Sequence, residues 1–164
     1  MRKIVFVCYG NIHRSVTAEY YLRKILERKG IENIEVISRG LMGSADFPKP
    51  GGENLRDYPR DWQEAKLVFD NFEIDTSDQR ATPITLDDVT SADLVVAMNQ
   101  DILNRAGGLY DQFPGYKNRM LLFPISKGYS GVEDPYGKNF VISMVIFQII
   151  AGLEINLDLY VDLN

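Results

Sequence analysis

The sequence predicts an α/β fold, a three-layer αβα domain with a central four-stranded parallel sheet. Two observations predict it: several apolar runs of strand length, and helical apolar spacing between the first two of them. Continuous apolar runs are typical of strands buried on both faces, as in a parallel sheet. Strands that alternate with helices indicate a layered α/β domain. In such sheets ligands bind outside the carboxyl ends of the strands, so the candidate site is sought there.

The first forty residues predict a βαβ unit. Residues 4–8 (IVFVC) predict a buried strand, and a Gly-Asn pair then interrupts it with turn chemistry. From Ser15 onwards apolar residues recur every three or four positions, and Gly30 ends the predicted helix. Residues 34–37 (IEVI) predict the second strand, which a right-handed crossover would place parallel to the first.

The remaining elements follow from the same signals. Residues 40–62 are rich in Gly, Pro and Asp and predict a long loop with one short helix near residues 53–58. Downstream, the pattern predicts a helix over 85–91 capped by Thr85, a strand over 93–99, a helix over 99–105 capped by Asn99, a strand over 120–123, a polar loop over 126–137 and a buried helix from 139 to about 157. No repeat or linker interrupts the pattern, so residues 1–164 are expected to form a single domain.

Composition and charge exclude several function classes. The chain has 45% hydrophobic and 25% charged residues, as expected of a globular protein in water. Its net charge of −5 does not attract nucleic acid or an anionic membrane, so any anion site must be built locally. A single cysteine excludes an intramolecular disulfide, and no Cys/His cluster indicates a metal. We therefore expect a cytoplasmic protein with no membrane segment, no metal and no nucleic-acid partner.

The loop after the first strand, residues 8–15 (CYGNIHRS), is the candidate site. Five residues separate Cys8 from Arg14, which lets the backbone curl into a cup with its N–H groups pointing inward. Arg14 would hold two phosphate oxygens, and Cys8 at the base would act as a thiolate, which a helix N-terminus and nearby cations favour. Ser15 would form a hydrogen bond with the sulfur. The other residues assigned to this phosphate-binding loop are Tyr9, Gly10, Asn11, Ile12 and His13.

A phosphatase also needs a proton donor for the leaving oxygen. Asp134, in EDPYG, is the candidate, because Pro135 stiffens the turn and Tyr136 can stack on an aryl substrate. The alternative is an ordinary Asp-Pro surface turn, since sequence alone does not place this segment against the cup. Cys8 likewise has the alternative of a small apolar core residue, and its loop context is what favours a nucleophile.

Two segments resemble one known family. VCYGNIHRSVTAE (7–19) resembles the signature of low-molecular-weight protein tyrosine phosphatases, commonly V-C-x-G-N-x-C-R-S-P-x-A-E. EDPYG (133–137) resembles that family's acid-bearing D-P-Y loop. Intervening segments (ISRGL, FPKP, DQRATPIT and SADLVVAMN) fall in the family's order, the first two as in bacterial members, so the resemblance covers nearly the whole chain. It implies a four-stranded parallel sheet flanked by helices.

The resemblance implies hydrolysis of phosphotyrosine in proteins through a phosphocysteine intermediate. Cys8 would attack phosphorus, Arg14 would hold the phosphoryl oxygens, and Asp134 would act first as general acid and then as base. Asn11 matches a loop-bracing asparagine, and Ser38 matches a serine hydrogen-bonded to it. No metal or organic cofactor is implied. The expected partners are tyrosine-phosphorylated proteins, with the enzyme acting as a monomer.

Four positions depart from the family pattern. His13 replaces a second cysteine that often protects the nucleophile by a reversible disulfide, so we expect peroxide to inactivate the enzyme without one. His13 either adds positive charge or packs. Val16 replaces a proline at the helix start, and Gln79 replaces a histidine, keeping a hydrogen-bond donor but no charge. Gly137 replaces a second tyrosine of the acid loop. The aromatic substrate wall would then consist of Tyr9, Phe47 and Tyr136.

Three rival functions share parts of this pattern. A thioredoxin-coupled arsenate reductase needs further cysteines, which this chain lacks. A protein-arginine phosphatase of the same family tends to have threonine at the position of Ile12, whereas isoleucine is typical of tyrosine-specific members. A weakly active phosphoprotein-binding module would result if the departures abolished turnover.

Overall fold

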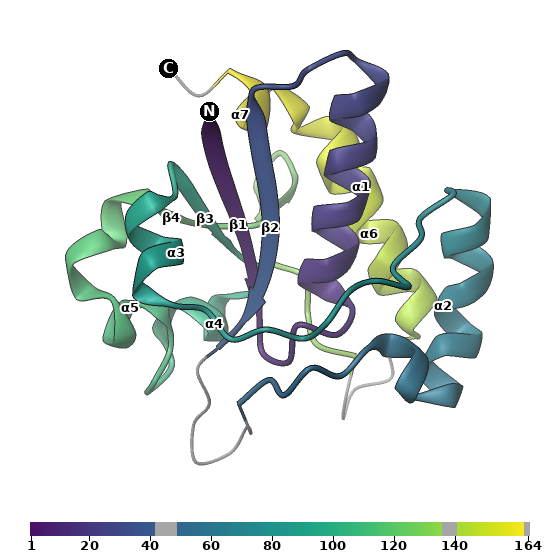
Figure 1. Cartoon of the computed structure of the whole chain (residues 1–164). Coiled ribbons are helices and arrows are strands. Elements are labelled where there is room, and N and C mark those ends of the chain that lie inside the picture. The colour runs from purple at the N-terminus through teal and green to yellow at the C-terminus, as the bar shows by residue number, and fades with distance from the viewer. Residues whose placement is uncertain (42–48, 136–140, 163–164) are drawn as a thin grey trace.

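The fold is a parallel sheet between two layers of helices (Figure 1). The computed structural model describes residues 1–41, 49–135 and 141–162. Its main sheet consists of β1 (Arg2–Cys8), β2 (Ile34–Gly40), β3 (Leu94–Ala97) and β4 (Met120–Leu122). These strands lie in the order β2-β1-β3-β4, and every neighbouring pair is parallel. The predicted fold class and its four-stranded parallel sheet are confirmed.

Helices cover both faces of the sheet, as Figure 1 shows. One core is enclosed by α1 (Arg14–Arg28), α2 (Pro59–Asn71) and α6 (Ile142–Ile155). The other is enclosed by α3 (Leu86–Ser91), α4 (Gln100–Asn104) and α5 (Leu109–Gln112). Successive residues of β1 alternate between the two cores, which explains its unbroken apolar sequence. The remaining elements are η1 (Leu55–Asp57), η2 (Pro114–Arg119), β5 (Pro124–Ser126), β6 (Tyr129–Ser130) and α7 (Leu157–Val161).

Two predicted helix starts are confirmed by their capping hydrogen bonds. The Thr85 side chain accepts from the N–H of Asp88 at 3.1 Å, and the Asp88 carboxylate accepts from the N–H of Thr85 at 3.0 Å. This reciprocal pair is a capping box at the start of α3. The Asn99 side chain accepts from the N–H of Ile102 at 3.1 Å and so caps α4. Over the described ranges, no helix is long and apolar enough to cross a membrane.

Two loop predictions are wrong, and one short helix was not predicted. The loop predicted over 40–62 ends early, because α2 begins at Pro59, whose fixed φ suits the first turn of a helix. The polar loop predicted over 126–137 contains β6, which pairs antiparallel with β5. The buried helix predicted from 139 to about 157 is confirmed as α6, and the short helix α7, which the sequence did not predict, follows it after Asn156.

The candidate loop begins at the carboxyl edge of the sheet, where β1 lies between β2 and β3. Cys8 pairs in register with Gly40, the last residue of β2. The N–H of Leu41 donates to the carbonyls of Cys8 and Tyr9, at 3.1 Å each. A Cβ on Gly40 would lie 2.4 Å from Cγ of Pro50 and 2.7 Å from the Tyr9 carbonyl oxygen. No larger residue therefore fits at position 40 unless the loop moves.

Candidate active site

The backbone between β1 and α1 is suited to an anion. Asn11 has a φ of 54°, in the left-handed region that asparagine tolerates better than most residues. The 15-residue helix α1 begins at Arg14 without a side-chain cap. The first N–H groups of such a helix lack intrahelical partners and favour negative charge. These groups follow the loop at which the sequence predicted a phosphate.

Cys8 lies buried at the base of this loop. Its Sγ is 3.0 Å from Oγ of Ser15, in the first turn of α1. The hydrogen bond that the sequence predicted between this serine and the sulfur is therefore present. A hydroxyl in this place can donate to a thiolate, which stabilises both a nucleophile and a leaving group.

Asn11 braces the loop through both ends of its side-chain amide. Its Nδ2 donates to Oγ of Ser15 at 3.1 Å and to Oγ of Ser38 at 2.8 Å. Its Oδ1 accepts from the N–H of Thr82 at 2.9 Å. Gln79 donates from Nε2 to the Asn11 carbonyl oxygen at 2.9 Å, so the amide at position 79 supplies a neutral donor to the loop. The contact between Asn11 and Ser38 expected from the sequence is present.

Sequence reasoning missed Glu19, which lies on α1 and is only 7% exposed. Its carboxylate accepts a hydrogen bond from the Ser38 hydroxyl and forms an ion pair with Arg23 at 2.6 Å. Burial raises the pKa of Glu19, and the hydrogen bond from Ser38 and the charge of Arg23 oppose that rise. The only signal in the sequence was that Glu19 is the last residue of the segment 7–19. That position did not reveal that Glu19 is buried.

Arg14 and Asp134 meet beside the loop, although 120 positions separate them. The Arg14 guanidinium is buried, and its Nη2 pairs with Oδ2 of Asp134. Its Nη1 donates to the carbonyl of Val132 at 3.2 Å. Its Nε is buried and has no hydrogen-bond partner among the described residues. The structure thus brings the EDPYG carboxylate to the loop, which sequence alone did not establish.

His13 contributes no positive charge to the loop. Burial, and then the charge of Arg14, lower the pKa of His13 from 6.5 to about 3. Its imidazole is therefore neutral at physiological pH. Of the two alternatives left by the sequence, packing is the one that agrees with this burial.

The three residues predicted to form an aromatic wall differ in what is known of them. Tyr9 is 8% exposed and packs in the core beside α4 and α5. Its hydroxyl accepts from Arg105 at 3.1 Å, and the guanidinium groups of Arg14 and Arg105 lie over its ring. Phe47 and Tyr136 lie outside the described residues. The wall therefore stays a prediction.

In the part of the chain that the structure describes, no group of three or more His, Cys, Asp or Glu residues is placed to hold a metal ion.

Three features of this site are typical of a cysteine-dependent phosphatase. They are a buried thiol at the end of a parallel strand, a helix N-terminus without a side-chain cap, and an arginine that pairs with a carboxylate. A model of the family "Low molecular weight phosphotyrosine protein phosphatase" matches residues 3–154. The chain belongs to this family.

Relatives and solved structures agree with this assignment. The low molecular weight protein-tyrosine-phosphatase PtpA of Staphylococcus aureus is 31% identical over 139 residues, 85% of this chain and 81% of that protein. The low molecular weight protein tyrosine phosphatase of T. tengcongensis and a YwlE mutant of Bacillus subtilis each superpose with a TM-score of 0.72 at 25% identity, over 96% of this chain and 99% of theirs. A YwlE arginine phosphatase mutant with a phosphorylated active-site serine has the same fold, with a TM-score of 0.73 at 24% identity over 99% of both chains.

Proposed function

We propose that this chain is a protein-tyrosine phosphatase that hydrolyses phosphotyrosine through a phosphocysteine intermediate. The observation that carries the proposal is the convergence of Cys8, Arg14 and Asp134 at one end of the sheet. Membership of the family and the relative PtpA, a protein-tyrosine-phosphatase, support the same reaction.

In the first step the Cys8 thiolate attacks phosphorus in line with the leaving group. The S–P bond forms while the P–O bond to the tyrosine oxygen breaks. The acid form of Asp134 gives its proton to that oxygen, so that a neutral phenol departs. The Arg14 guanidinium and the first N–H groups of α1 hold the three equatorial oxygens of the transferring group.

In the second step water attacks the phosphocysteine. The S–P bond breaks, inorganic phosphate leaves, and the Asp134 carboxylate takes a proton from the water, which restores its acid form. The Cys8 sulfur departs as a thiolate, and the nearby Ser15 hydroxyl stabilises it. The cycle as proposed uses no metal and no organic cofactor.

The alternative is a protein-arginine phosphatase, since an arginine phosphatase shares this fold. Ile12 packs partly buried against the core on the α1 side of the sheet. Its side chain carries no hydroxyl that could help to orient an attack on a P–N bond. This residue favours a phosphate ester of tyrosine over a phosphoarginine.

Activity assays with three substrates test the proposal: p-nitrophenyl phosphate, a phosphotyrosine peptide and a phosphoarginine peptide, all in the presence of a chelator. Wild type should hydrolyse the first two, Cys8→Ser should be inactive, and Asp134→Ala should lose roughly 10²–10⁴-fold on the peptide. The matched control Asp101→Ala removes an exposed carboxylate of α4 and should retain full activity.

Each other outcome has a definite meaning. Turnover of the phosphoarginine peptide alone would establish the alternative. Binding of phosphopeptide without turnover would indicate a binding module. Activity in Cys8→Ser would overturn the mechanism altogether.

We further propose that residues 1–164 act as one domain, as a monomer, on tyrosine-phosphorylated proteins in the cytoplasm. The family match over residues 3–154 supports one domain. A mechanism that depends on the single thiol of Cys8 supports a reducing compartment. Sedimentation at assay concentration tests the monomer, and a dimer there would overturn that part of the proposal.

A further inference from the structure

A chain of hydrogen bonds leads from the candidate nucleophile to a buried carboxylate on α1. Ser15 Oγ lies 3.0 Å from Cys8 Sγ, and Asn11 Nδ2 links Ser15 to Ser38. Ser38 in turn donates to Oε2 of Glu19. All five residues are buried, so water does not compete for these hydrogen bonds. Glu19, which is paired with Arg23, is the carboxylate end of this chain.

The direction of each hydrogen bond follows from the chemistry of its partners. An ionised carboxylate only accepts, so the Ser38 hydroxyl must donate to Glu19, and its oxygen accepts from Asn11. The Asn11 Oδ1 accepts from the N–H of Thr82, which turns Nδ2 towards both serines. Ser15 accepts from Asn11 and so keeps its one hydrogen for the sulfur.

The Asn11 amide is the element of this chain that has two orientations. Turned by half a rotation, its carbonyl would face the two serines, and Ser15 would donate to Asn11 instead of to sulfur. That orientation requires Ser38 to give its hydrogen to Asn11. Two groups prevent this: the Thr82 N–H requires an acceptor at Oδ1, and Glu19 holds the Ser38 hydrogen itself.

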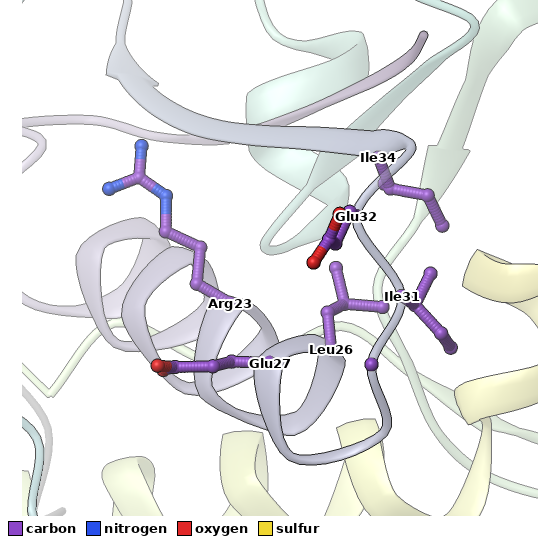
Figure 2. A pocket seen from close by; sticks show the side chains of 7 residues that line it. Arg23, Leu26, Glu27, Ile31, Glu32 and Ile34 are labelled. Carbon is purple, nitrogen blue, oxygen red and sulfur yellow. The ribbon is translucent and has the colours of Figure 1, made fainter.

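The burial of Glu19 is supported by two neighbouring arginines. Arg23, one turn along α1, pairs with it at 2.6 Å and also donates from Nε to the carbonyl of Val36 in β2 at 2.8 Å. Figure 2 shows Arg23 reaching from α1 to β2 at the edge of a surface pocket. Arg39, which forms an ion pair with Asp88, is the other cation that acts on Glu19. A buried carboxylate costs more than apolar packing even when paired, which argues for a role beyond stability.

We propose that Glu19 is a positioning residue for Cys8. By accepting the Ser38 hydrogen, it acts together with the Thr82 N–H to hold the Asn11 amide in the orientation that leaves Ser15 to donate to the sulfur. The inference rests on the proposed function only in taking Cys8 as the reactive thiol.

Alkylation of Cys8 tests this role without any substrate, because Cys8 is the only cysteine in the chain. The rate of reaction with iodoacetamide, followed against pH, reports thiolate formation at this residue. We expect Glu19→Ala, and Glu19→Met of more similar volume, to move the midpoint to higher pH and to slow alkylation at pH 7 about 10-fold, since a hydrogen bond to a charged group is lost. The direction is diagnostic, because removal of a nearby negative charge by itself moves the midpoint to lower pH.

Three further variants separate positioning from a structural effect. Glu27→Ala removes an exposed carboxylate of the same helix and should leave the midpoint unchanged. Glu19→Gln retains an acceptor for Ser38 and should restore part of the loss. Glu19→Ala in a Ser15→Ala background should cause no additional upward shift, since Glu19 acts through Ser15.

The proposal is overturned if Glu19→Ala leaves the midpoint in place or lowers it, or if its upward shift persists without Ser15. Should Glu19→Ala fail to fold by circular dichroism, Glu19→Met decides, and the absence of an upward shift there overturns the proposal equally. A wild-type protein that hydrolyses none of the three phosphosubstrates would overturn the proposed function while leaving the alkylation comparison intact.

Discussion

The two ends of the candidate loop hold their polar side chains in different ways. At Asn11, Nδ2 donates to two buried serines and Oδ1 accepts from Thr82, so both ends of the amide are bound within the protein. At Arg14, Nη1 donates to a backbone carbonyl and Nη2 pairs with Asp134, whereas Nε has no partner among the described residues. We call the Asn11 end closed, because the protein itself binds both ends of the amide. We call the Arg14 end exchangeable, because its guanidinium has N–H groups to which a phosphate can bind.

This difference suits a fixed nucleophile beside an exchangeable clamp. Nε and Nη2 lie along the same edge of a guanidinium, and that edge grips two oxygens of a phosphate. Asp134 holds one of these two positions in the structure. A phosphate bound to Arg14 along this edge would displace Asp134, which is the residue proposed to protonate the leaving group.

The largest expected effect comes from changing the exchangeable end. Arg14→Lys keeps a positive charge but removes the planar fork, so kcat/KM on p-nitrophenyl phosphate should fall about 10²–10³-fold. The control Arg56→Lys changes an arginine that stacks on Trp62 and pairs with Asp75, and it should behave as wild type. An Arg14→Lys enzyme within a factor of ten of wild type would remove the clamp from the mechanism.

Breaking the closed end should cost stability. Asn11→Ala loses three hydrogen bonds, each contributing about 1 kcal/mol, so the free energy of unfolding in urea should fall by about 3 kcal/mol. A further cost of about 1 kcal/mol is expected for alanine at a φ of 54°. Asn11→Gly loses the same hydrogen bonds but has no backbone strain at this φ. The difference in stability between the two variants therefore measures the strain alone. If Asn11→Ala and Asn11→Gly are both as stable as wild type, the hydrogen bonds of Asn11 do not stabilise this end of the loop.

His13, which lies between Asn11 and Arg14, predicts that the stability of the fold depends on pH. The pKa of His13 is about 3 in the folded protein and about 6.5 when unfolded, so the unfolded state binds the extra proton between these values. The contribution of neutral His13 to the free energy of unfolding is complete above pH 6.5 and is lost as the pH falls towards 3. Between pH 7 and pH 5 the loss is about 2 kcal/mol. Urea denaturation at both pH values measures it. His13→Gln should lack this part of the drop, and an equal drop in both proteins would assign it to other groups.

The smallest expected effect tests competition at the Arg14 guanidinium. Asp134→Asn replaces the paired carboxylate with a neutral amide, so inorganic phosphate should bind about 5-fold more tightly, as an ion pair of about 1 kcal/mol no longer opposes it. Calorimetric titration of phosphate measures this, with Asp101→Asn as the control. Weaker phosphate binding by Asp134→Asn would show that Asp134 does not compete with phosphate for Arg14.

The elements that the sequence predicts correctly have local causes. The apolar run of residues 4–8 is enough to indicate a buried strand, and Thr85 and Asn99 cap helices through bonds to residues three positions away. The helix α2 escapes prediction because Gly, Pro and Asp dominate residues 40–62, although Pro59 is a common first residue of a helix.

The candidate site divides in the same way. Cys8 and Arg14 can be read from one short loop, but the pairing of Arg14 with Asp134 depends on how the whole chain folds. Thr82 meets Asn11 across 71 positions through its backbone, which no side-chain pattern encodes. Glu19 looks like an ordinary helical glutamate until its burial is known.

Gly40 ties the end of β2 to the loop by leaving no space between them. A methyl group at this position would collide with Pro50 at 2.4 Å and with the Tyr9 carbonyl oxygen at 2.7 Å, and would press on Cβ of Asn11 at 3.3 Å. A change at position 40 is tolerated only after Pro50 and the loop have shifted. Over many generations these positions can therefore vary as one unit, and a substitution that arises at position 40 by itself should be eliminated by selection.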